Sequence, residues 1–203
     1  MNTPEQTFEI QIGRRQQVLS VSRCEYERMA DGIRNPGIRR LSPGTKLFRV
    51  ADRRDSGGER NNNRIDPGAG NWWCGIRAFN KNMEYCVQHD QGNRGLGYSF
   101  REACAILFEW GSNCDILVEA ILTRNAWVFY GQGKRKSGTL NGVSYDFNGW
   151  PDIEQWYLPN ITERVGSGGS NTHTRLKGAP HAVIQVYRTT DIRSLQRITD
   201  GVR

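Results

Sequence analysis

Three short stretches of the sequence carry side chains that could do chemistry together. Arg49 interrupts the apolar stretch KLFRVADRR, Ser99 follows a Gly-Tyr turn, and Asp152 and Glu154 stand in DIEQWYLPNI. A guanidinium suits a pyrophosphate, because its planar fork donates bidentate hydrogen bonds to phosphate oxygens. A carboxylate can stabilise the positive charge that develops at a sugar carbon during glycosidic cleavage. What these side chains could do together depends on whether the three stretches meet in the folded chain.

Each of these residues also has a purely structural interpretation. Arg49 could be an edge-strand residue with its charge in water, because a charged side chain is seldom buried without a partner. Ser99, with Glu102 three residues later, fits a helix N-cap in a capping box. Glu154 could be a solvated turn residue, and Asp152 after Pro151 is a common turn pairing.

The composition describes a folded domain with an excess of positive charge. The 203 residues carry a net charge of +7, which favours anionic partners such as a phosphate-rich ligand, a nucleic acid or an acidic protein. No run approaches the roughly 18 apolar residues of a membrane span, and the N-terminus has no ordinary secretion signal. The five cysteines show neither CxxC pairs nor zinc spacing with histidine, so we expect free thiols and no metal site.

The elements that must position these side chains follow from local patterns. Helices are predicted over residues 20–34, which Ser20 or Ser22 could cap, and from Ser99 to about 110. Polar, glycine-rich loops are expected over 53–70 and 162–180, and a hairpin tip over 133–142. Strands are predicted over 7–13, 46–52, 71–80, 114–123, 127–133 and 181–191. Short strands with one or two helices indicate the α+β class.

The order of these features resembles one family of enzymes. An arginine ends the first core strand, a GYS turn and a helix follow, then come an apolar strand and an acidic-x-Glu stretch. This order is similar to that of the Arg–Ser–Glu class of mono-ADP-ribosyltransferase toxins, the family of cholera and pertussis toxins. The resemblance covers about residues 45–190. No Ser-Thr-Ser triplet is present, only Ser99 stands at its place, and the first acidic position is Asp152.

The resemblance implies a fold, a substrate and a set of roles. The fold would be a split β-sandwich of two small mixed sheets with a few flanking helices. Residues 45–203 would form the catalytic domain and residues 1–44 an N-terminal extension of unknown role. NAD would be the substrate, and its nicotinamide–ribose bond would be cleaved between the sheets.

The resemblance also assigns site residues. Arg49 would bind the pyrophosphate, Glu154 would be the catalytic carboxylate and Ser99 would hold it by a hydrogen bond. Asp152 would steer the nucleophile, and Tyr130 would stack on the nicotinamide. Glu119, inside the apolar strand ILVEAIL, is a further candidate for the acid or for its partner.

Several alternatives remain open at the level of sequence. If water were the acceptor, the chain would be an NAD glycohydrolase toxin, as in the related RES family. A basic ribonuclease toxin would use His89, His173 or His181 with Glu154 for acid–base chemistry. A noncatalytic module could bind an acidic partner by charge alone.

Partners are expected from the same resemblance, and the location is expected from the missing secretion signal. As a transferase, the chain would modify a protein or a nucleic acid, and a cognate immunity or chaperone protein is an expected partner. The chain is expected to be cytoplasmic in the producer, or to be delivered into a target cell.

Overall fold

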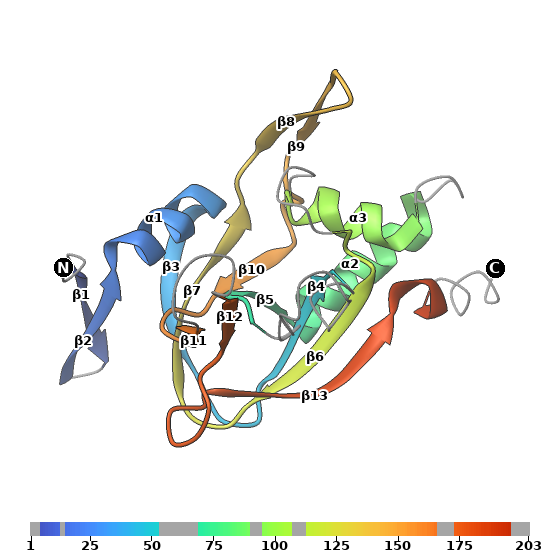
Figure 1. Cartoon of the computed structure of the whole chain (residues 1–203). Coiled ribbons are helices and arrows are strands. Elements are labelled where there is room, and N and C mark those ends of the chain that lie inside the picture. Colours follow the sequence, from blue (N-terminus) through green and yellow to red (C-terminus); the bar gives the residue numbers. More distant parts are fainter. Residues whose placement is uncertain are drawn as a thin grey trace.

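A seven-stranded antiparallel sheet forms the centre of the computed structural model, which describes residues 5–12, 15–52, 69–89, 95–106, 113–165 and 173–195 (Figure 1). The order of its strands is β13-β6-β4-β5-β10-β7-β3. These strands are β3 (Ile33–Leu41), β4 (Lys46–Ala51), β5 (Trp72–Gly75), β6 (Ile116–Leu122), β7 (Ala126–Gly133), β10 (Glu154–Tyr157) and β13 (Ile184–Asp191).

The remaining elements lie around this sheet. Three two-stranded pairs accompany it: β1 (Glu5–Ile12) with β2 (Arg15–Ser22), β8 (Lys136–Leu140) with β9 (Val143–Phe147), and β11 (Thr162–Val165) with β12 (His173–Leu176). The helices are α1 (Arg23–Gly32), α2 (Ile76–His89) and α3 (Gly95–Ala103). Helix α1 with β1 and β2 lies on one side of the molecule, α2 and α3 lie on the other, and the β8–β9 hairpin projects as an arm (Figure 1).

The α+β class is as expected, whereas the arrangement of the sheet differs from two small mixed sheets. All recorded pairings in the large sheet are antiparallel, and the sheet is continuous. Its two halves meet only through the short strand β5, which pairs with β4 and with β10 at two residues each. The pairing of β4 with β5 stops at Phe48, while β4 continues beside β6 as far as Ala51. The sheet therefore forks at Arg49.

The two faces of the sheet have separate cores, because successive side chains of a strand point to opposite sides. On the first face lies the cluster that contains Leu47, Trp73, Val118 and Trp156. The second face is covered by two groups. Helices α2 and α3 pack there around Phe100, and α1 packs with the N-terminal hairpin against Phe129 and Tyr157. Below, these are called the first and the second face.

The N-terminal segment is built into this architecture. Ser22 caps α1 by accepting a hydrogen bond from the backbone N–H of Glu25 at 3.3 Å, as one of the two predicted caps. The helix ends at Gly32, and the Asn-Pro-Gly of residues 35–37 forms a bulge within β3 instead of the helix stop. Strand β3 is an edge strand of the large sheet, so residues 33–41 are part of it.

Other local predictions met the structure with mixed results. Residues 76–89 form helix α2 where only a strand was expected after residue 71, and residues 162–165 and 173–176 form strands where a loop was expected. The hairpin tip is at Asn141 and Gly142, both with positive φ, which suits a tight two-residue turn. The predicted loop over 53–70 lies almost wholly outside the described residues.

Candidate functional site

A row of side chains crosses the first face of the sheet from the fork outward. Trp73 of β5 lies opposite Trp156 of β10, which in turn lies opposite Tyr130 of β7. Arg49 alternates with the core residues Leu47 and Ala51, so its side chain stands on this same face. The guanidinium carbon is 5.6 Å from the centroid of the Trp73 ring. The row therefore brings an arginine from the first core strand against a line of aromatic rings, of which Trp73 and Trp156 are buried.

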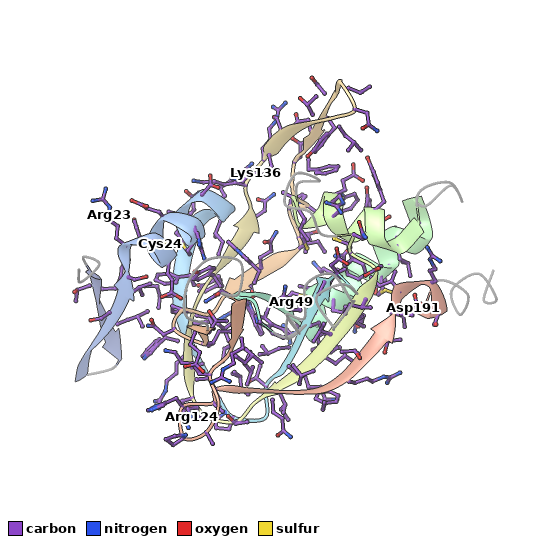
Figure 2. The ribbon with its side chains drawn as sticks, viewed as in Figure 1. Arg23, Cys24, Arg49, Arg124, Lys136 and Asp191 are labelled. Carbon is purple, nitrogen blue, oxygen red and sulfur yellow. The ribbon has the colours of Figure 1, made fainter. Side chains whose placement is uncertain are left out.

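Arg49 is held at the fork and is not an edge residue. Strand β4 lies between β6 and β5, which excludes the interpretation of an edge strand. A Cβ atom added to Gly70 would lie only 1.7 Å from Arg49 Nη1, so the guanidinium occupies the space that the missing side chain leaves. Trp73 Nε1 donates to the Gly70 carbonyl oxygen at 2.7 Å and fixes this turn. Figure 2 shows Arg49 in the middle of the molecule.

Glu154 begins strand β10 on the same face as Trp156, and its side chain is 37% exposed. Its Oε1 atom accepts a hydrogen bond from Trp156 Nε1 at 2.5 Å and is paired with the guanidinium Nη2 of Arg39. Glu154 is thus a fixed, half-buried strand residue, and the alternative of a solvated turn residue is wrong.

Arg39 is a site residue that the sequence did not reveal. Its guanidinium carbon lies 4.1 Å from the ring centroid of Tyr130 and 5.1 Å from that of Trp156. Burial against these rings lowers the pKa of Arg39 from its ordinary value, because a charge loses hydration there. No local pattern in the sequence shows that the Arg39 side chain of β3 reaches across β7 to Glu154 of β10.

Arg49 and Glu154 share a face without touching. They are separated by two strand spacings and two residues along a strand, or about 12 Å between Cα atoms in a regular sheet. The buried rings of Trp73 and Trp156 lie between them as part of the core. Tyr130, expected to stack on a ligand, joins the same cluster, with Arg39 over its ring.

A cavity of about 270 Å³ opens where the sheet forks. Its walls are mostly apolar, from the sheet, from α2 and α3 and from the segment after α3, and its charged lining residues are Arg49, Lys134 and Lys136. Lys136 Nζ is 2.6 Å from Asp31, and Lys134 Nζ donates to the carbonyl oxygen of Ala30 at the end of α1. Both lysines therefore also stabilise the C-terminal end of that helix. Figure 2 shows Lys136 at the base of the β8–β9 arm.

The other predicted site residues lie elsewhere. Ser99 is buried in the middle of α3, where its hydroxyl donates to the Gly95 carbonyl oxygen at 3.5 Å, so the N-cap prediction is wrong. The helix begins four residues earlier than its capping-box pattern indicated. Because α3 covers the second face, the structure does not bring Ser99 to Glu154.

Asp152 and Glu119 are engaged by other charges. Asp152 is exposed on the turn before β10 and lies 3.8 Å from Lys81 of α2. Glu119 of β6 pairs with Arg188 of β13 at 3.1 Å. Neither carboxylate has a recorded contact with Glu154.

The sequence left a histidine-based alternative that the structure tests only in part. His181 is exposed in a turn, whereas the side chains of His89 and His173 lie outside the described residues. Within the described part of the chain, no group of three His, Cys, Asp or Glu side chains is placed to hold a metal ion.

No helix among the described residues is long and apolar enough to cross a membrane. All five cysteines are free, and burial raises the pKa of Cys74 to about 12.

Comparisons with known proteins add little. The sequence matches no family model and no curated protein. A chain in the solved structure described as "Structure of Tne2 in complex with Tni2" is similar at 12% identity and a TM-score of 0.35, over 75% of this chain and 92% of that one. At this TM-score the similarity says nothing about activity or substrate.

Proposed function

We propose that this protein cleaves the nicotinamide–ribose bond of NAD and transfers the ADP-ribose, in the manner of the ADP-ribosyltransferases that its sequence resembles. One observation carries the proposal. Arg49 and Glu154, the two residues that the resemblance singles out most clearly, lie on one face of a sheet that forks between them.

The residues present fit such a substrate. Arg49, beside the buried ring of Trp73, suits the doubly negative pyrophosphate, and the half-buried Tyr130 is the ring that could contact a planar base. The cavity at the fork is just below the roughly 300–1,000 Å³ of small-molecule sites. It includes Arg49 but not Glu154, and most of its other walls belong to the second face, so it would take only the part of a dinucleotide that lies beyond Arg49. A regular sheet would put the Cα atoms of Arg49 and Glu154 about 12 Å apart, a span that the rest of the dinucleotide would have to cover.

Glu154 would act on the ribose. When the bond between ribose C1′ and the nicotinamide nitrogen breaks, the electron pair leaves with nicotinamide and positive charge develops on the ribose. A fixed carboxylate stabilises that charge, and losing such a group typically costs about 3–4 kcal/mol of barrier. The acceptor then forms a bond to C1′, and its proton passes to solvent or to a base.

Two acceptors remain in the proposal. Transfer to a protein or nucleic acid is the expectation from the family, and a toxin with a cognate immunity or chaperone partner belongs to it. Hydrolysis of NAD is favoured by a specific observation: Asp152, expected to steer a macromolecular nucleophile, is paired with Lys81 and has no recorded contact with Glu154.

The test combines product analysis with matched variants. The protein is incubated with NAD labelled in the adenylate moiety, with and without a cell lysate, and nicotinamide and labelled macromolecules are measured. Glu154→Gln should lower nicotinamide release by about 10²–10³-fold, and Glu163→Gln, a paired surface carboxylate, should not. Label on a macromolecule indicates transfer, and free ADP-ribose alone indicates hydrolysis. Equal release by wild type and Glu154→Gln would refute the proposed function.

A further inference from the structure

Arg39 is the residue most closely engaged with Glu154, although it lies on the edge strand β3 and β7 separates that strand from β10. Its guanidinium pairs with Glu154 Oε1, and its carbon lies over the rings of Tyr130 and Trp156. We propose that Arg39 is the positioning residue of the site, which holds the carboxylate of Glu154 ionised and in one orientation. This inference rests on the proposed role of Glu154 in NAD cleavage.

The surroundings of Arg39 leave its guanidinium little freedom. Two aromatic rings hold its plane, and cation–π contacts of this kind favour a charge that has lost part of its hydration. Its Nε atom is buried and has no hydrogen-bond partner among the described residues. Gly37 lies two residues earlier on β3, opposite Tyr130, and a Cβ there would lie 2.6 Å from the phenol ring. The glycine therefore lets the ring lie close to the strand, under the guanidinium.

The pairing treats the two carboxylate oxygens differently. Oε1 accepts from both Arg39 Nη2 and Trp156 Nε1, whereas Oε2 has no donor among the described residues. A carboxylate held by one oxygen leaves the other available to accept a hydrogen bond from a ligand. Oε2 is therefore the atom that would contact the ribose, and Arg39 acts through Glu154 without touching the substrate.

The electrostatics follow from the groups that face Glu154. On its own strand Trp156 donates, and β7 contributes the Tyr130 phenol and the amide of Gln132, which pairs directly opposite Glu154. Strand β3 contributes Arg39 and also Arg34, which pairs with Gln132. Only Arg39 among these charges is recorded in contact with the carboxylate. Removing it should make Glu154 harder to ionise.

The experiment compares Arg39→Gln and Arg39→Lys with Arg40→Ala. Arg40 is the next residue of β3, exposed and on the other face, so it is a matched control. Steady-state NAD cleavage is measured from pH 4 to 8. Arg39→Gln should lower kcat by about 10²-fold, the cost of a misplaced reacting group, with little change in KM. Its acid limb should move to higher pH. Arg39→Lys, which keeps charge without the planar fork, should restore the acid limb but only part of kcat.

The possible outcomes separate this inference from the proposed function. If wild-type protein releases no nicotinamide, both fail. If Glu154→Gln loses activity while Arg39→Gln keeps the wild-type rate and pH profile, only the role of Arg39 fails. A loss of rate in Arg39→Gln without movement of the acid limb would also overturn it, because it would indicate a general structural defect. Melting temperatures of all variants identify misfolding, and Arg39→Lys then provides the test.

Discussion

Substitution of Gly70 by alanine should separate binding of the pyrophosphate from folding. A Cβ at this position would lie 1.7 Å from Arg49 Nη1 and 2.5 Å from Cζ, whereas ordinary contact begins at 3.4 Å. Backbone conformation is not an obstacle, since Gly70 has no positive φ. The guanidinium must therefore retreat by about 1.7 Å, and the backbone need not move.

The magnitude follows from this displacement. A hydrogen bond of about 2.9 Å does not survive such a shift, and bonds to charged groups contribute about 1.5–3 kcal/mol each. Loss of one such bond to the pyrophosphate raises the KM for NAD about 10–150-fold. Stability should change by less than about 1 kcal/mol. Alanine lowers the conformational entropy of the unfolded chain, which stabilises the fold by about 0.4–1 kcal/mol. This gain offsets the weakened contact between Arg49 and Trp73.

The assay pairs NAD-cleavage kinetics with urea unfolding for Gly70→Ala, Arg49→Ala, the double variant and Gly178→Ala. Gly178 is the matched control, because nothing lies within 4 Å of a Cβ built there. In the Arg49→Ala background the Gly70 substitution should have no further effect on KM, since the group it displaces is gone. A wild-type KM in Gly70→Ala, or a penalty that persists without the arginine, would refute the reasoning.

Three further predictions concern the surroundings of the site. Glu25 of α1 accepts hydrogen bonds from Asn71 Nδ2 at 3.1 Å and from the Asn160 backbone N–H at 2.9 Å, at the ends of β5 and β10. Glu25→Ala should therefore cost about 1–3 kcal/mol in the free energy of unfolding, measured in urea; a cost below about 0.5 kcal/mol would contradict this role. Asp152→Asn should leave nicotinamide release within about threefold of wild type, because exposed ion pairs contribute little; a hundredfold loss would make Asp152 catalytic. Iodoacetamide at pH 8.5 should label exposed Cys24 well before Cys74, whose burial raises its pKa to about 12 and keeps the thiol protonated until well above pH 9; equal labelling in the native state, read by peptide mass spectrometry, would contradict the described burial.

Local signals in the sequence were enough for α1 and for six strands (β1, β4, β5, β6, β7 and β13), because the pattern of adjacent residues carries them. The alternation over 46–52 and the apolar run over 114–123 predicted β4 and β6 closely. Residues 76–89 were missed because the preceding strand WWCG masks the start of the helix, and its residues have no capping serine or aspartate. The capping pattern at Ser99 is present, but α3 begins at Gly95, where the packing of Leu96 and Phe100 stabilises an earlier start, and it ends at Ala103 instead of near residue 110.

The sequence by itself determined the α+β class, six of the thirteen described strands and two of the residues on which the proposed site depends, Arg49 and Glu154. Only the tertiary structure decided which partners they meet. Arg39 reaches Glu154 from 115 positions away, and Gly70 makes room for Arg49 across the fork. The physical reason is that strand periodicity specifies the face on which a side chain stands, whereas strand order specifies its neighbours. That order is set by burial summed over the whole sheet, which no short stretch of sequence contains.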